Sequence, residues 1–224
     1  VDTIKGTFTT MINLMDRYSD LHFSQSQAVT YSVAEKRFPR LFERIKERVK
    51  EGRWEVTASM WVEGDLNMGG TEALVRQFLY AKRYVKEKFG VDPEICWEPD
   101  TFGHVWTLPQ ILKKCGIRYY YFMRCGKVYP LFWWEGPDGS RVLAFTSVYN
   151  NTVTPKNILE ICNKIHKGYG LKTSMFVYGV GDHGGGPTIE DVEAAHRIQS
   201  KPALPRVSFS SAQAFFREVE QQLR

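Results

Sequence analysis

Glu94-Ile-Cys-Trp-Glu-Pro-Asp-Thr-Phe-Gly-His104 is an apolar run that stops at a proline and leads into a polar loop. Residues 95–97 are typical of a buried strand, and Pro99 ends it because proline has no backbone N–H to give to a sheet. An acid at the carboxyl end of a buried strand is where α/β folds carry catalytic groups, so Asp100 is a candidate catalytic residue. The same aspartate could instead cap the helix that follows.

Strand and helix patterns alternate on both sides of this stretch. Short apolar runs predict strands at 21–24, 54–60, 94–98, 119–123, 174–178 and 207–209. Apolar residues at steps of three and four predict helices at 9–17, 39–50, 71–89, 155–166, 188–199 and 211–223, and one that ends at 114. Runs at 132–134 and 142–145 flank Gly-Pro-Asp-Gly and predict a hairpin inserted between these units. This order predicts an α/β fold with a mainly parallel sheet, in one domain.

The loops that follow parallel strands open on one face of the sheet, so their side chains should converge. The polar residues in these loops are Glu63 or Asp65, Asp100, Arg124 and Asp182. Two carboxylates on neighbouring strand ends, here Asp100 and Asp182, are what glycoside hydrolysis requires. One acts as nucleophile or base and the other as proton donor. Arg124 could orient a hydroxyl group or hold a neighbouring carboxylate.

Aromatic side chains supply flat surfaces for sugar rings, although about half of them are expected in the core. They are Trp54, Trp61, Phe102, Trp106, Trp133, Trp134 and Tyr149. The glycine-rich segment 179–186 lacks the lysine of a phosphate-binding loop and the register of a dinucleotide-binding loop. We therefore expect its glycines to let the backbone pass close to a small ligand and to expose Asp182, with His183 beside it as a possible metal ligand.

The charge balance does not point to nucleic acid or to a membrane. The net charge is +5 and the pI is about 9.0, but the basic residues alternate with glutamates on helical patterns, as on solvated helix faces. The sequence contains no long apolar segment and no secretory signal. Four widely spaced cysteines without a C-x-x-C pair predict free buried thiols in the cytoplasm.

Several motifs, in order along the chain, carry a family resemblance. They are Gly52-Arg-Trp-Glu55, Met60-Trp-Val-Glu63, Leu74-Val-Arg-Gln-Phe-Leu79, Pro99-Asp-Thr-Phe-Gly-His104, Leu108-Pro-Gln-Ile-Leu112 and Gly181-Asp-His-Gly-Gly-Gly-Pro-Thr188. Together they resemble the N-terminal catalytic domain of the family 38 α-mannosidases, most closely the cytosolic and microbial branch. The resemblance covers nearly the whole chain. It implies an irregular (β/α) barrel, and a single catalytic domain over residues 1–224 that is truncated at both ends.

Carried over to this sequence, the resemblance implies a retaining α-mannosidase that releases terminal α-linked mannose from oligosaccharides. Asp100 would be both the nucleophile and a ligand of zinc or another divalent cation, and Asp182 the general acid/base. Phe102, Arg124 and Tyr149 would contact the substrate. The two carboxyl groups of a retaining enzyme should lie about 5 to 5.5 Å apart. His183 departs from the glycine that many relatives carry at that position, which puts the proton donor in question.

The metal ligands are where the chain departs most from the family pattern. That pattern has a His-x-Asp pair upstream of a segment like residues 1–4 and a further histidine well downstream, and this sequence contains neither. Because catalytic zinc sites commonly have three protein ligands, we expect weak or no metal affinity and little activity for these 224 residues alone. The longer parent protein would be active, with any homo-oligomer formed through C-terminal domains that this chain lacks.

Two other functions remain open from the sequence. A metal-dependent polysaccharide deacetylase is one, since similar barrels host that chemistry and an aspartate with a histidine could serve it. A catalytically silent carbohydrate-binding module is the other, and the missing metal ligands favour it.

Overall fold

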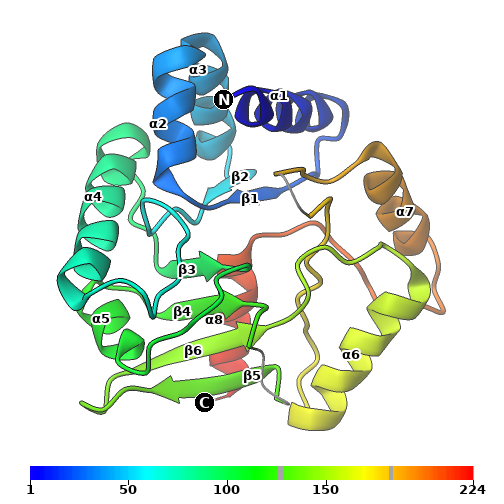
Figure 1. The fold of residues 1–224 in the computed structure, drawn as a ribbon. Helices are drawn as coiled ribbons and strands as arrows, with labels where there is room; N and C mark the ends of the chain where they lie inside the picture. The colour runs from blue at the N-terminus through cyan, green and yellow to red at the C-terminus, as the bar shows by residue number, and fades with distance from the viewer. Residues whose placement is uncertain (126–128, 182–183, 224) are drawn as a thin grey trace. The chain divides into compact units, whose positions relative to one another are not determined.

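The computed structural model describes residues 1–125, 129–181 and 184–223 (Figure 1). The chain divides into two compact units. The first unit comprises Val1–Phe23, Ala34–Trp54 and Val148–Arg224, and the second unit comprises Ser24–Val33 and Glu55–Ser147. The single domain expected from the sequence stays a prediction.

A four-stranded sheet forms the centre of the second unit. Its strands are β3 (Ile95–Glu98), β4 (Tyr119–Phe122), β6 (Arg141–Thr146) and β5 (Leu131–Glu135), in that order across the sheet. β3 pairs with β4 and β4 pairs with β6 in parallel, while β5 pairs with β6 antiparallel. All four residues of β4 are buried, as is usual for an inner strand of a parallel sheet.

Two helices complete the core of the second unit. α5 (Leu108–Lys114) packs against β6 and β5 (Figure 1). α4 (Thr71–Phe89) buries an apolar face of Leu74, Phe78, Ala81 and Val85. Leu74 and Phe78 share one hydrophobic cluster with Cys96, Leu112, Tyr120 and Ala144. Gly90 closes α4 in the left-handed conformation at φ 69°, as expected for a helix-ending glycine.

The first unit is mainly helical. Its helices are α1 (Asp2–Arg17), α3 (Pro39–Lys50), α6 (Pro155–Tyr169), α7 (Ile189–Gln199) and α8 (Ala212–Gln222). Side-chain caps begin three of them: Thr154 for α6, Thr188 for α7 and Ser211 for α8. Three further elements have residues in both units, namely β1 (Phe23–Gln25), α2 (Ala28–Arg37) and β2 (Trp54–Val56), and β1 pairs with β2 in a two-stranded sheet.

The prediction of an α/β fold with parallel strands is confirmed, but the described strands form only small sheets. The irregular barrel is not shown by them and stays a prediction. The strands predicted at 174–178 and 207–209 are wrong, since that part of the described chain has only an isolated bridge between Asn151 and Tyr178. Their apolar residues instead pack on a hydrophobic cluster that includes residues of α6 and α7. A short apolar run in the sequence looks the same whether it is buried by such packing or by pairing in a sheet.

Three other details differ from the expectations. β6 is an inner strand of the main sheet, so the hairpin predicted at 132–134 and 142–145 is part of that sheet and not an insertion between units. α2 was not predicted, because its apolar and polar residues do not separate clearly onto two faces. Of the four cysteines, which are all free, only Cys96 is buried. Among the described helices, none combines the length and the apolar character needed to span a bilayer.

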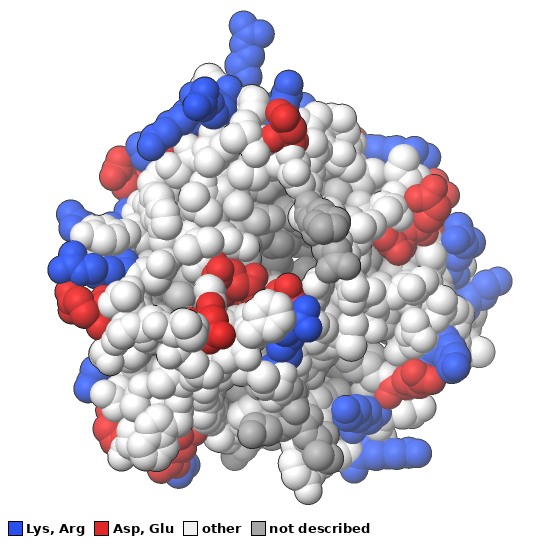
Figure 2. Space-filling model, in the orientation of Figure 1, with Lys and Arg blue, Asp and Glu red and all other residues white. Residues whose placement is uncertain are grey.

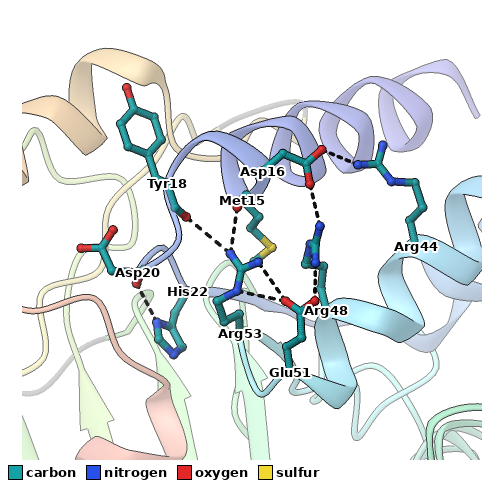
Figure 3. A network of polar contacts seen from close by, with 9 residues as sticks. All are labelled: Met15, Asp16, Tyr18, Asp20, His22, Arg44, Arg48, Glu51 and Arg53. Atoms are coloured by element: carbon teal, nitrogen blue, oxygen red, sulfur yellow. Dashed lines mark hydrogen bonds and ion pairs between the residues drawn. The ribbon is translucent and has the colours of Figure 1, made fainter.

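Ion pairs tie α1 to α3, and a hydrogen bond ties α1 to the turn before β2, within the first unit (Figure 3). Asp16 accepts hydrogen bonds from Arg44 and, at 2.6 Å, from Arg48. Arg53 donates to the Met15 carbonyl at 2.9 Å and to the carboxylate of Glu51. Partial burial would raise the pKa of Asp16, but the hydrogen bonds from Arg48 and Arg44 hold it below its usual value.

We predict that Asp16→Asn lowers the stability of the chain. Because the pKa of Asp16 is lowered by folding, its contribution is present at neutral pH and is lost as the pH falls through the folded-state pKa. For a half-exposed network we expect a loss of about 0.5 to 1 kcal/mol near neutral pH and a smaller loss at about pH 3. Urea denaturation at the two pH values measures this loss of stability, with Glu43→Gln, which changes an exposed carboxylate of α3, as control. An equal loss of stability at the two pH values would contradict the prediction.

Candidate active site

The pairing of β3 with β4 places Asp100 beside Arg124. Glu98 pairs with Phe122 across the two strands, and Asp100 and Arg124 each lie two residues beyond that pair. Both side chains therefore emerge at the same edge of the sheet, where Arg124 Nε donates to Asp100 Oδ1 at 2.7 Å. The two side chains are 38% and 40% exposed for Arg124 and Asp100, so the pair faces solvent and remains accessible to a ligand.

Phe102 completes this group. The guanidinium carbon of Arg124 lies 4.4 Å from the centroid of the Phe102 ring, a cation–π contact, and the ring is 66% exposed. Figure 2 shows acidic side chains gathered with a basic one over the carboxyl ends of β3 and β4. The structure thus brings together three of the predicted site residues, Asp100, Phe102 and Arg124. α5 has Thr107 at its N-cap, so the alternative role of Asp100 as a helix cap is wrong.

Glu63 contacts the backbone of the Asp100 loop. Its Oε1 accepts a hydrogen bond from the backbone N–H of Asp100 at 2.6 Å. Burial raises the pKa of Glu63 to about 7, assisted by the nearby charge of Asp100 and opposed by the N–H groups of Asp100 and Thr101. The sequence pointed to Glu63 or Asp65 as a converging acid, and the structure identifies Glu63. Asp65 instead accepts the backbone N–H of Asn67 within its own turn.

Glu98 is a buried acid that the sequence reasoning missed. It lies at the end of β3 with 2% of its surface exposed, and its Oε1 is 4.0 Å from the Cys96 sulfur. Burial, and then the charge of Glu63, raise the pKa of Glu98 well above its usual value. A glutamate inside an otherwise apolar strand was the available signal.

His104 supports Arg124 from behind. Its Nε2 lies 2.9 Å from the Arg124 carbonyl oxygen, and its Nδ1 lies 2.8 Å from the hydroxyl of Tyr120. A carbonyl can only accept, so Nε2 carries the proton. In the neutral tautomer Nδ1 then accepts from the buried Tyr120 hydroxyl. Both ring nitrogens are engaged, and His104 acts as a structural support.

The described residues do not form a metal site. Among them, no group of three or more His, Cys, Asp and Glu side chains is placed to hold a metal ion. Asp100 is the one family ligand present, and its Oδ1 is already bonded to Arg124. Since catalytic zinc commonly has three protein ligands, these residues do not fit the metal that the family resemblance implies. Metal binding by Asp100 stays a prediction.

The remaining predicted site residues cannot be joined to this group. Asp182 and His183 lie outside the described residues, so the acid/base role and the separation of the two carboxyl groups stay predictions. Tyr149 belongs to the first unit, and its predicted contact with substrate also stays a prediction.

Comparison with known proteins gives a consistent picture. Residues 1–224 match the model of the glycosyl hydrolases family 38 N-terminal domain. The chain is 35% identical over 223 residues to alpha-mannosidase G of Dictyostelium discoideum, covering 96% of this chain and 20% of the relative. It is also 35% identical over 224 residues to human alpha-mannosidase 2C1, covering 96% of this chain and 21% of that protein. The chain thus spans about a fifth of the length of these curated relatives.

Solved structures share the fold. An alpha-mannosidase from Enterococcus faecalis V583 superposes with a TM-score of 0.79 at 16% identity, over 98% of this chain and 27% of that one. A probable polysaccharide deacetylase from Pseudomonas aeruginosa PAO1 superposes with a TM-score of 0.61 at 14% identity, over 96% of this chain and 73% of that one. At such identities the likeness concerns the fold alone.

We predict that His104→Ala destabilises the chain by about 2 to 4 kcal/mol, because the change leaves a cavity and removes the partner of the buried Tyr120 hydroxyl. Tyr120→Phe removes only the hydroxyl and should cost about 1 kcal/mol. Urea denaturation of both variants measures these losses. If His104→Ala were as stable as the wild-type chain, the structural role assigned to His104 beside Tyr120 and Arg124 would be contradicted.

We also predict that the 224-residue chain binds zinc only weakly, because its described residues provide no set of three ligands. Calorimetric titration with zinc chloride at neutral pH measures the affinity. A sub-micromolar affinity would contradict this, and a His183→Ala variant would then test whether that histidine supplies a ligand.

Proposed function

The chain belongs to glycosyl hydrolase family 38, whose N-terminal domain it matches, and from this we propose that it serves to hydrolyse terminal α-linked mannose from oligosaccharides. Relatives that cover nearly the whole chain carry the name alpha-mannosidase. The observation that carries the proposal is the ion pair of Asp100 and Arg124 at adjacent ends of parallel strands, with the exposed ring of Phe102 over the guanidinium.

Asp100 is the proposed nucleophile. A carboxylate that attacks an anomeric carbon needs one oxygen directed at the sugar and a fixed orientation of the other. Arg124 Nε holds Oδ1 at 2.7 Å, and we assign the attack to Oδ2. The reaction would form a covalent glycosyl-enzyme intermediate that water then hydrolyses, so that the sugar is released with its configuration retained.

Phe102 and Arg124 are the proposed substrate contacts. Phe102 is largely exposed although it is aromatic, and flat apolar rings pack well on the apolar faces of sugars. Its ring covers the guanidinium on one side, which leaves the N–H groups of Arg124 that Asp100 does not use to donate to sugar hydroxyls. Asp182 is the proposed acid/base, by its match to the family motif.

We predict that Asp100→Asn in the full-length protein lowers kcat at least about 10³-fold, because an amide is not a nucleophile for glycosyl transfer. Hydrolysis of 4-nitrophenyl α-mannoside measures this. Asp92→Asn, the same change at an exposed position of the second unit, is the control and should leave kcat unchanged.

The proposal fails if Asp100→Asn keeps substantial turnover. Proton NMR of the mannose first released reports the stereochemistry, and inversion would exclude the covalent intermediate. Release of acetate from a chitooligosaccharide by the wild-type protein, without release of mannose, would favour the deacetylase function instead. Mannose binding without hydrolysis would favour the binding module.

A further inference from the structure

Two loops of the second unit are joined along their length next to the Asp100 carboxylate. They are the segments 63–67 and 100–103. The hydrogen bonds between them run in sequence order: Asp100 N–H to Glu63 Oε1 at 2.6 Å, Thr101 Oγ1 to the Gly64 carbonyl, and Leu66 N–H to the Gly103 carbonyl at 3.3 Å. The conformation of the Asp100 loop is therefore set from outside its own strand.

Gly103 marks the closest approach of the two loops. A Cβ atom at this position would clash with the side chains of Asn67 and Asp65. Asp65 cannot turn aside without losing the hydrogen bond that it accepts from the Asn67 N–H at 2.9 Å. A side chain at position 103 would therefore have to displace Asn67 and Asp65 from their places in the packing of one loop on the other.

The segment that carries Glu63 is in turn fixed to α4. The backbone N–H of Trp61 donates to the Gln77 carbonyl at 3.2 Å, and the N–H of Val62 donates to Gln77 Oε1 at 3.0 Å. The Trp61 ring meets the Tyr84 ring edge to face at 5.8 Å. Glu63 thus directly follows two loop residues that are anchored to α4, and such support is what a group needs if it is to hold another residue in place.

Asp100 is held at two points by two different elements. Glu63 holds its backbone N–H, and Arg124 holds its side-chain oxygen. The other side of the same peptide is held as well, because the Pro99 carbonyl accepts the backbone N–H of Met123 at 3.2 Å. Glu63 and Met123 together fix the orientation of the peptide before Asp100, and with it the direction of the carboxylate.

We propose that Glu63 is a positioning residue for Asp100: its carboxylate accepts the backbone N–H of Asp100 and so fixes the direction in which the Asp100 side chain points. The role requires an oxygen acceptor at this position, which the side-chain carbonyl of glutamine also supplies. The positioning stands on the geometry alone. Its effect on catalysis rests on the proposed function.

Amide hydrogen exchange followed by NMR on the 224-residue chain tests the positioning without any sugar. Glu63→Ala should speed exchange at the amide of Asp100 by about tenfold or more, because its acceptor is lost. Glu63→Gln should keep the rate within about threefold of wild type, since the acceptor oxygen remains. Glu72→Ala, which removes an exposed carboxylate from α4, is the control for a general change in stability.

An unchanged Asp100 exchange rate in Glu63→Ala overturns the proposal, and so does equal acceleration in Glu63→Gln. If Glu63→Ala fails to fold, Gly103→Ala provides a second route, because its methyl group pushes the two loops apart and should also speed exchange at Asp100. Unchanged exchange in that variant would again overturn the positioning.

Kinetics in the full-length protein tests the consequence. Glu63→Ala should lower kcat by about 10- to 100-fold with KM within about threefold, because misplacing a reacting group costs rate more than binding. Glu63→Gln should restore most of the rate. Such a rescue would not be expected if the lower kcat of Glu63→Ala came only from loss of folded protein. If Asp100→Asn remained active while exchange at Asp100 still depended on Glu63, the proposed function would fail and the positioning would stand.

Discussion

Everything at the candidate site depends on the parallel pairing of β3 with β4. The pairing of Glu98 with Phe122 fixes the two strand ends level with each other, and the residues two positions later form the Asp100–Arg124 ion pair. The register is held by stacked rings, since Trp97 lies on Tyr121 with centroids 3.8 Å apart. A slip by one residue would exchange the two faces of the strand and bury the wrong side chains. The ion pair is thus a consequence of packing deep in the sheet.

The residues at the strand ends were the part of the site that local sequence could predict. Asp100 and Arg124 each follow an apolar run, and the direction of parallel strands was enough to predict that they meet. The contribution of Glu63 could not be read from the sequence in the same way. It lies in a polar loop with two acids, Glu63 and Asp65, and only the path of that loop decides which one reaches Asp100.

The fold was predictable to a similar extent. Helices with a clear apolar face, such as α3 and α4, match their expected ranges of 39–50 and 71–89, whereas α2 lacks such a face and was missed. Short apolar segments were ambiguous, because their burial can be satisfied by packing on helices instead of by pairing, as at Val207 and Phe209. The place of β6 in the main sheet depends on a long-range partner, β4, that no local pattern specifies.

The joined loops also bear on how this domain could be altered. Segment 61–70 has the composition of a tolerant surface loop, with three glycines and several polar residues, and would be a natural place to vary length or graft a binding sequence. Its hydrogen bonds to residues 100–103 make it part of the support of the Asp100 carboxylate. A change in its length would move Asp100, so new specificity is better sought around Trp106, whose exposed ring lies beyond the joined segment.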